Sequence, residues 1–475
     1  MPTIVSRYGY HKVHRSVGLW GYLMWSRGAP VLFSTSGYGD VYLHVSDASS
    51  ECAIDASVQR LRLRQRRKLK GSAMTQNPIA ANGRGYLAIP GPSVMPDAVL
   101  QAMHRPSPNI YGGELLDITA TLIPDLKRVA RTSGKCAIYI GNGHAAWEAA
   151  LSNVISAGDR VLAPITGHFG DRWADMATGL GAEVDIIDFG KQSPMDMARI
   201  TEALKADTAH QIKAVLAVHV DTSTSIRNDF AALRRAIDAA GHPALLMADC
   251  IASLGCDQFE MDEWGVDIMV AACQKGLMVP AGLSFVFFNE KAEAVRSAMP
   301  RVSRYWDWVP RGDPEQFWQY FNGTAPTHHL YGLRTSLGII HGEGIENVWA
   351  RHAVLARAIW AACDAWSQKG ALAMNVTDVK NRSNAVTSLS LAYPDGTKLR
   401  EWVEKHLGLT LGIGLGMAAS GARDSDAYFR LGHMGHVNGQ MIMGMLGGME
   451  TGMTALGIEH GAGALEAAAA VIAKG

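Results

Sequence analysis

The chain has 475 residues, a length that favours two folded domains over one. Hydrophobic residues make up 48% of the sequence and charged residues 19%, a composition typical of compact globular proteins and not of disordered chains. The 44 basic and 44 acidic residues balance overall, but residues 1–73 hold 11 Lys and Arg against 4 Asp and Glu. The rest of the chain is therefore mildly acidic, which argues against nucleic acid as its partner.

Residues 1–73 differ from the rest of the sequence because they show no sustained helical or strand period and end in the basic run Arg60–Lys70. Such a run is typical of an arm that binds nucleic acid or an anionic surface, or of a transit sequence, although four acidic residues disfavour the latter. The favoured interpretation is a disordered extension, or sequence upstream of a true start at Met74.

No apolar run reaches the length of a membrane span, so no membrane association is expected. None of the six cysteines forms a C-x-x-C pair, and three of them lie in or beside predicted strands. Buried free thiols in a reducing compartment are the simplest interpretation, and this predicts a cytoplasmic protein.

From Thr119 onward, apolar runs that suit buried strands alternate with helical stretches, which predicts a mostly parallel sheet with helices on both faces. The predicted strands are 137–140, 160–165, 184–189, 214–220, 244–249, 268–272 and 283–289, and the helices between them include 145–155, 171–180, 194–205 and 230–240. A second unit begins at about Gly344, with helices at 345–370 and 463–474 and strands at 385–391 and 429–432. The expected domains are therefore a large one over residues 74–343 and a small one over 344–475.

Several polar segments follow predicted strands, and in open α/β sheets ligands bind beyond the carboxyl ends of the strands. Gly141–Glu148 joins a strand to a helix, and its glycines and free N–H groups suit a phosphate. Phe169 follows another strand, where an aromatic ring stacks on a cofactor or belongs to the core. Thr222 ends a further strand, and its hydroxyl either contacts a cofactor or caps a helix.

Asp249 ends the apolar strand 244–249, and Lys275 follows 26 residues later in a weakly polar segment. This arrangement suits pyridoxal phosphate. A lysine amine forms a Schiff base with the cofactor aldehyde, and a carboxylate pairs with the protonated pyridine nitrogen. The pair turns the ring into an electron sink, so Lys275 and Asp249 are the predicted catalytic residues.

Arg430 lies in the apolar, strand-like run Tyr428–Gly435, where an unpaired charge is costly to bury. Its planar guanidinium suits the carboxylate of a substrate, and a structural salt bridge is the equally weighted alternative. The pairs His433/His436 and His328/His329 have no carboxylate or cysteine at ligand spacing, so no metal site is expected.

Taken together, these segments resemble the class V pyridoxal-phosphate aminotransferases, in particular the alanine–glyoxylate and serine–glyoxylate group. The resemblance runs from Tyr86 to Lys474 and leaves residues 1–73 outside. It rests on nine ordered segments: 90–93, 141–151, 158–162, 219–224, 248–255, 274–282, 324–326 with 330–334, 343–352 and 430–435. It implies the aspartate-aminotransferase-like fold of type I, with a large mostly parallel-sheet domain and a smaller C-terminal α+β domain.

The resemblance also implies a role for each matching residue. Lys275 and Asp249 match the Schiff-base lysine and the partner of the pyridine nitrogen. Gly143, His144 and Gln274 match positions that bind the phosphate, and Phe169 matches an aromatic residue that stacks on the cofactor ring. Thr222 matches a hydroxyl near the phenolic oxygen, and Ile251 matches a position that contacts the cofactor. Arg430 matches the arginine that binds the substrate carboxylate, and Gly91 matches the glycine of a loop beside the substrate. Members of the family are homodimers, so Thr324 is expected to reach the neighbour's phosphate. Asp221, Ile251 and Phe321 stand where Glu, Val and Tyr are commoner, and only Phe321 is expected to cost a contact.

The expected reaction is ping-pong transfer of an amino group from a small L-amino acid, alanine or serine, to glyoxylate or pyruvate. Pyridoxamine–pyruvate transamination is the first rival, but its phosphate loop would be expected to carry an acid, and Asn142-Gly143-His144 has none. Aspartate–glyoxylate transamination is the second, with Arg301, Arg304 or Arg423 as possible second cations. A cysteine desulfurase is disfavoured because no cysteine follows Cys363, and a non-catalytic vitamin sensor because the lysine, aspartate and arginine are all present.

Overall fold

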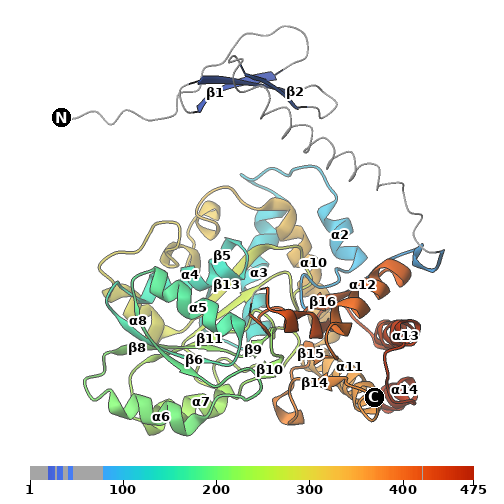
Figure 1. Ribbon diagram of the computed structural model, residues 1–475. Coiled ribbons are helices and arrows are strands. Elements are labelled where there is room, and N and C mark those ends of the chain that lie inside the picture. Colours follow the sequence, from blue (N-terminus) through green and yellow to red (C-terminus); the bar gives the residue numbers. More distant parts are fainter. Residues whose placement is uncertain (1–19, 27–28, 36–40, 46–78, 420) are drawn as a thin grey trace. The chain divides into compact units, whose positions relative to one another are not determined.

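A computed structural model describes residues 20–26, 29–35, 41–45, 79–419 and 421–475 of the chain (Figure 1). The chain separates into two units, Met1–Gln76 and Asn77–Gly475. In the first unit, β1 (Trp20–Ser26), β2 (Ala29–Thr35) and β3 (Val41–Val45) form an antiparallel sheet in the order β1-β2-β3. Sequence analysis did not anticipate these strands. The basic run Arg60–Lys70 and the proposed start at Met74 lie outside the described residues.

The second unit is built around a seven-stranded sheet in the order β5-β13-β12-β11-β8-β6-β7. All neighbouring pairs are parallel except those made by β13, which is antiparallel to both β12 and β5. In chain order the strands are β5 (Lys135–Gly141), β6 (Arg160–Ile165), β7 (Glu183–Asp188), β8 (Ile212–Val218), β11 (Leu245–Asp249), β12 (Ile268–Ala272) and β13 (Gly282–Phe288). The seven predicted strands are confirmed, and each predicted end lies within two residues of the observed end. The antiparallel direction of β13 was not predicted.

Helices cover both faces of this sheet (Figure 1). The face with Ala137 and Tyr139 packs against α4 (Gly143–Val154), α5 (His168–Gly179) and α8 (Glu290–Ala298). The face with Cys136 and Ile138 packs against α3 (Glu114–Ala130), α6 (Met197–Ala206), α7 (Phe230–Ala239) and α10 (Thr327–Glu343). Because successive residues of one strand enter both clusters, the strands are apolar along their whole length, which is the pattern expected of a sheet buried on both sides.

A smaller five-stranded sheet has the order β14-β15-β17-β16-β4. Its strands are β4 (Tyr86–Ala88), β14 (Ala373–Met374), β15 (Val386–Ser390), β16 (Leu409–Ile413) and β17 (Tyr428–Gly432). The helices packed with it are α11 (Ile345–Trp366), α12 (Asp395–Leu407), α13 (Gly439–Leu456) and α14 (Ala464–Ile472). Since β4 pairs with β16 in parallel, this sheet includes residues that sequence analysis assigned to the large domain of residues 74–343.

Short elements complete the second unit. They are the hairpin β9 (Val220–Asp221) and β10 (Ile226–Arg227), the helices α2 (Asp97–Met103) and α9 (Val309–Gly312), and the 3-10 helices η1 (Ile79–Ala81), η2 (Phe317–Tyr320), η3 (Val379–Asn381) and η4 (Arg423–Ala427).

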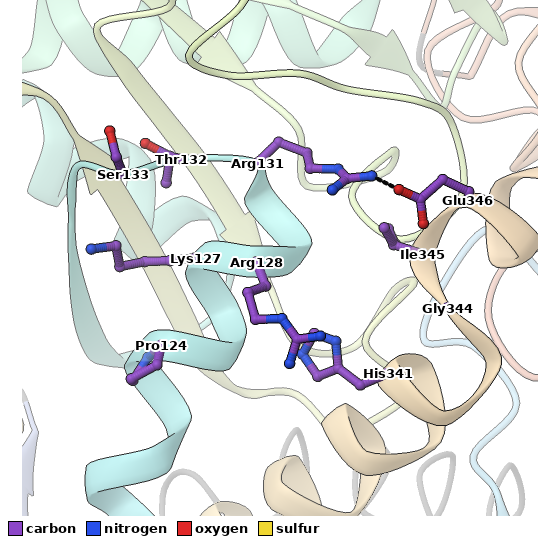
Figure 2. A pocket seen from close by; sticks show the side chains of 10 residues that line it. All are labelled: Pro124, Lys127, Arg128, Arg131, Thr132, Ser133, His341, Gly344, Ile345 and Glu346. Carbon is purple, nitrogen blue, oxygen red and sulfur yellow. Dashed lines mark hydrogen bonds and ion pairs between the residues drawn. The ribbon is translucent and has the colours of Figure 1, made fainter.

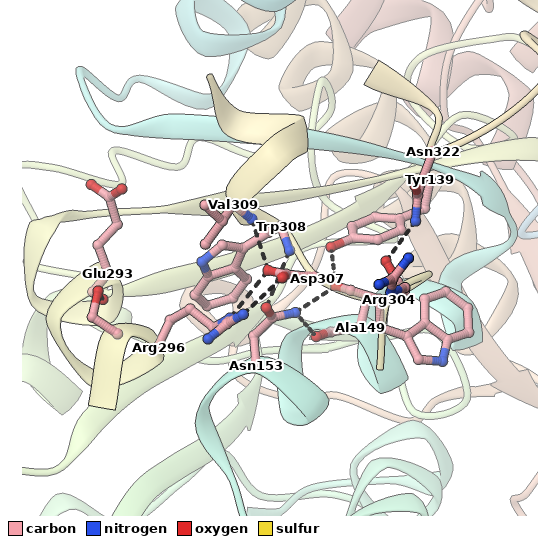
Figure 3. A network of polar contacts seen from close by, with 12 residues as sticks. Tyr139, Ala149, Asn153, Glu293, Arg296, Arg304, Asp307, Trp308, Val309 and Asn322 are labelled. Carbon is pink, nitrogen blue, oxygen red and sulfur yellow. Dashed lines mark hydrogen bonds and ion pairs between the residues drawn. The ribbon is translucent and has the colours of Figure 1, made fainter. Parts of the chain in front are cut away.

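The segment that follows α8 is held to α4 by a buried polar network (Figure 3). The Asn153 side chain on α4 donates to the Trp306 carbonyl at 2.6 Å and accepts from the Trp308 N–H at 3.2 Å. The Tyr139 hydroxyl on β5 donates to the same Trp306 carbonyl at 2.7 Å. Because the side chains of Asn153 and Tyr139 are buried, these bonds satisfy their polar groups, and the segment is fixed against the helix.

Candidate active site

A cavity of about 220 Å³ lies at the carboxyl ends of β5, β8 and β11 and beside the turn after β12. This is the rim at which an open α/β sheet binds its ligands. All the predicted site residues line it except Gly91, Thr324 and Arg430. The lining residues are Asn142, Gly143, His144, Trp147, Phe169, Val220, Thr222, Asp249, Ile251, Ala252, Gln274 and Lys275.

The Lys275 amine donates a hydrogen bond to the carbonyl of Pro90. Burial and the nearby Arg430 charge lower its pKa to about 8, and Asp249 opposes the shift. A lysine with such a pKa is partly neutral near pH 7, which makes its amine a nucleophile and a base. The loop beside it depends on Gly91, whose φ is +88° and where a Cβ would lie 2.6 Å from Lys275 Cε. Gly91 therefore contacts the lysine, although it does not line the cavity.

The Asp249 carboxylate lies at the end of β11, and each of its oxygens accepts one hydrogen bond. Oδ1 accepts from the Ile251 N–H at 2.7 Å and Oδ2 from the Trp147 indole N–H at 3.0 Å. Burial raises the pKa of this carboxyl to about 7, and the two hydrogen bonds oppose that shift. A cation beside Asp249 would favour its ionised form further, which fits the protonated nitrogen of a pyridine ring.

The turn expected to bind phosphate is the first turn of α4. The Asn142 side chain caps this helix by accepting the His144 N–H at 3.1 Å, so α4 starts two residues before the predicted helix. A Cβ at Gly143 would lie 2.5 Å from Ile251 Cδ1, so a larger residue at this turn would push the Ile251 side chain aside. The free N–H groups of a helix start bind phosphate oxygens.

Gln274 supplies a further test of whether pyridoxal phosphate fits. Its Oε1 is buried and finds no donor among the described residues. A buried amide oxygen without a donor is costly, and with the opposite amide orientation Gln274 would offer its NH₂ group to an acceptor such as a phosphate oxygen. Together with the Lys275 amine and the Asp249 carboxylate, this cradle fits the aldehyde, pyridine nitrogen and phosphate of the cofactor.

Phe169 reaches the cavity because Asp221 fixes the start of α5. The buried Asp221 carboxylate accepts the N–H groups of Phe169 at 2.8 Å and of Gly170 at 3.1 Å, and both the N–H and the hydroxyl of Ser223. The cap of α5 thus comes from β9, more than fifty residues away. Sequence analysis regarded Asp221 as a neutral replacement of Glu, whereas the structure gives it a local role in holding the Phe169 turn.

Arg430 lies on β17 and points its donors at two carbonyls. Nε donates to Ile413 O at 2.6 Å and Nη1 to Thr222 O at 2.9 Å. Burial lowers its pKa to about 10, and Asp221 opposes the shift. No carboxylate lies within ion-pair distance of Arg430 in residues 79–419 and 421–475, so the structural salt bridge considered as an alternative is absent from this part of the chain. Its charge remains available to a substrate carboxylate.

Thr324 is exposed in the loop between η2 and α10 and does not contact the cavity. Phe321, three residues earlier, is fully buried in the main core. In a single chain, therefore, neither residue contributes to the site.

Trp147 is a site residue that sequence analysis did not single out. It lies one helical turn after Gly143 and His144, and this spacing places all three on the cavity side of α4. The helical period of the Gly141–Glu148 segment was therefore an available signal.

A larger cavity of about 730 Å³ lies between the end of α3 and the α10–α11 junction (Figure 2). Arg131 and Arg128, two of its cations, are paired with acids, Arg131 with Glu346 and Glu260 and Arg128 with Asp125. It holds none of the predicted site residues. In the described parts of the chain, no three His, Cys, Asp or Glu side chains gather as a metal site would require, and no helix is long and apolar enough to cross a membrane.

Comparisons with known proteins agree with this site. Residues 127–428 match the family described as aminotransferase class-V. The chain is 37% identical to a serine–glyoxylate aminotransferase of Methylorubrum extorquens, over 84% of this chain and 97% of that protein. It is 35% identical to an L-aspartate–glyoxylate aminotransferase of Paracoccus denitrificans, over 81% and 93% respectively.

Among solved structures, the pyridoxamine–pyruvate aminotransferase of Mesorhizobium loti aligns with a TM-score of 0.73 and 26% identity, over 82% of this chain and 97% of that one. This likeness confirms the predicted fold, a large mostly parallel-sheet domain joined to a smaller α+β part. With the family match over most of the second unit, it means that the chain belongs to the class V aminotransferases and is a transaminase whose cofactor is pyridoxal phosphate.

Proposed function

We propose that the chain transfers the amino group of a small L-amino acid, alanine or serine, to glyoxylate or pyruvate in a ping-pong cycle. The observation that carries this proposal is the position of Arg430, a buried guanidinium without an acidic partner among the described residues, close enough to Lys275 to lower its pKa. A planar guanidinium binds a carboxylate in a bidentate way and so orients the rest of the amino acid. The serine–glyoxylate relative supports serine as donor and glyoxylate as acceptor.

Each residue has a distinct task in this cycle. When bound, the pyridine ring withdraws electrons from the substrate carbon that loses its proton. Lys275 holds the cofactor through its amine, and its Nζ later takes the α-proton and returns it, for which a pKa near 8 is suitable. Asp249 keeps the ring nitrogen protonated, Gly143, His144 and Gln274 hold the phosphate, and Phe169 covers the ring. Thr222 supplies a hydroxyl near the phenolic oxygen, and Ile251 donates its N–H to Asp249.

A small donor is favoured over aspartate. Among the described residues, Lys275 is the only Lys or Arg that lines the 220 Å³ cavity. Of the arginines considered for a second carboxylate, Arg423 lies 4.5 Å over the Tyr393 ring, and Arg301 and Arg304 are exposed and outside the lining. A second carboxylate without a cation would be costly to desolvate. The aspartate–glyoxylate relative makes aspartate the donor to test against alanine and serine.

The active species is proposed to be a homodimer in which Thr324 reaches the neighbour's phosphate. Thr324 is exposed in one chain, which is consistent with that role. Its loop is held by a hydrogen bond from the Asn322 side-chain amide to the Arg304 carbonyl at 2.5 Å. Sedimentation of the purified protein tests the dimer. The five cysteines in the described chain are free and buried, which agrees with a reducing cytoplasm, and fractionation of cells tests that location.

The decisive experiment follows the absorbance of the purified protein with bound pyridoxal phosphate. L-alanine, L-serine and L-aspartate are added separately, and the donor that bleaches the band of the lysine-bound cofactor is the substrate. Glyoxylate or pyruvate should then restore the band and so name the acceptor. Bleaching by aspartate alone would replace the small-donor proposal with the aspartate–glyoxylate reaction.

The pyridoxamine–pyruvate reaction is a second candidate, because a solved enzyme of that name shares the fold. In that case the protein would form its absorbance band with pyridoxal, the compound that lacks the phosphate. Pyridoxamine would not bleach a bound cofactor, and it would be consumed as a substrate together with pyruvate. The Asn142-Gly143-His144 turn has no acid to disfavour the phosphate, which ranks this reaction second.

A further inference from the structure

Trp147 lies where the parts of the site meet. Its side chain is 1% exposed, and its indole N–H donates to Asp249 Oδ2 at 3.0 Å. Its ring lies edge-on to His144, with centroids 4.7 Å apart, and edge-on to Phe169 at 6.3 Å. One side chain thus contacts the phosphate turn, the aromatic residue at the ring and the carboxylate at the pyridine nitrogen.

The electrostatics around Asp249 make this hydrogen bond important. Burial and the nearby Asp221 carboxylate favour the protonated acid, whereas Lys275 and the two hydrogen bonds favour the ionised form. One of those donors is the Ile251 backbone N–H, which no side-chain change removes. The Trp147 indole is the only side-chain donor to Asp249 among the described residues. A neutral Asp249 would leave the pyridine nitrogen unprotonated and weaken its electron withdrawal.

We propose that Trp147 is a positioning residue for the reaction: its indole N–H holds the Asp249 carboxylate ionised and aimed at the cofactor's ring nitrogen. This inference rests on the proposed function and deepens it. Because Trp147 belongs to α4, the helix whose first turn binds the phosphate, one rigid element sets both the phosphate end and the nitrogen end of the cofactor.

The chain contains its own control. Trp173 on α5 stacks on Trp147 with centroids 6.0 Å apart and an interplanar angle of 16°, and it is equally buried. Its indole N–H has no partner among the described residues. The two indoles therefore share a stacking contact, but only Trp147 donates to Asp249 and also packs against His144 and Phe169. A purely structural role for Trp147 predicts that replacing either ring with phenylalanine has the same consequence.

The test compares Trp147→Phe with Trp173→Phe in the protein loaded with pyridoxal phosphate. The first readout is the ¹⁵N shift of labelled cofactor at neutral pH, which reports whether the proton between Asp249 and the pyridine nitrogen lies on the ring. Because the indole hydrogen bond favours the ionised carboxylate, its loss in Trp147→Phe should move that proton toward Asp249 and change the ratio of protonated to unprotonated ring nitrogen about 10-fold. The same loss should reduce kcat about 10-fold with little change in the KM of the amino donor. Trp173→Phe should change neither, and equal shifts in both variants, or none in Trp147→Phe, would overturn the proposal.

A second measurement separates an effect through Asp249 from a general loss of packing. Trp147→Phe should weaken binding of pyridoxal phosphate about 10-fold in the natural background but hardly at all in an Asp249→Ala background. An equal loss in both backgrounds would mean that Trp147 acts by packing alone. If the unsubstituted protein failed to bind pyridoxal phosphate, the proposed function itself would fail, an outcome distinct from any difference between variants.

Discussion

The contact between Gly91 and Lys275 leads to a prediction that separates strain from chemistry. In Gly91→Ala, the new Cβ would overlap Lys275 Cδ, Cε and Nζ, and alanine would also occupy a φ of +88°. Positive φ costs a non-glycine residue about 1–3 kcal/mol. The overlap itself falls on the end of a flexible side chain, so we expect Lys275 to move and to lose its hydrogen bond to Pro90, with little further cost to folding.

Gly158→Ala is the matched control, because Gly158 has a φ of +87° and no atom within 4 Å of a Cβ placed there. Both variants should lose about 1–3 kcal/mol of stability, measured by denaturant unfolding of the cofactor-free protein. Only Gly91→Ala should bind pyridoxal phosphate more slowly, by about 10-fold or more. The reason is that the displaced Lys275 amine loses its hydrogen bond to the Pro90 carbonyl, a bond of about 1.5–3 kcal/mol. The assay is the rate at which the absorbance band appears after cofactor is added. Equal rates in the two variants would refute the reasoning.

Three further outcomes are expected. Lys275→Ala should abolish turnover, measured with alanine and glyoxylate, while its circular dichroism spectrum stays that of the natural protein; near-normal rates would contradict the assignment. Arg430→Gln should raise the KM of the amino donor about 10- to 100-fold with cofactor binding retained, because a charge-assisted carboxylate contact is lost; steady-state kinetics decide this. The rate of cofactor capture should rise with pH and level off above about 8, since only the neutral Lys275 amine reacts and its pKa is lowered to about 8; a rise that continued to pH 10 would mean an unperturbed lysine.

The large sheet was predictable because strands buried on both faces leave continuous apolar runs in the sequence. The direction of β13 was not, since an apolar run reads the same in both directions and the turn at Lys275–Gly282 permits a return beside β12. The first turn of α5 was also missed, because its cap is Asp221, a residue of another strand. A local sequence pattern cannot predict a helix cap that is supplied by a residue more than fifty positions away.

Most of the candidate site followed from two rules, that strand ends converge and that a lysine needs a carboxylate partner for this chemistry. The contacts made by long side chains could not be predicted in the same way. The indole of Trp147 reaches Asp249 across 102 positions of sequence, and the pairing depends on the angle between α4 and β11. Thr324 stays a prediction, because a single chain leaves it exposed and a second chain is needed to test its role.

The pairing of β4 with β16 has a consequence for how the protein is made. Tyr86 lies opposite Leu409, about 320 residues later in the chain. During synthesis, β4 leaves the ribosome long before the strand beside which it must lie, so its edge has no partner while the large sheet is being completed. The loop from Pro90 that meets Lys275 follows directly after β4. The loop that meets Lys275 therefore follows a strand whose partner is synthesised only near the end of the chain, and a chain that ended before β16 would lack the strand beside which β4 lies.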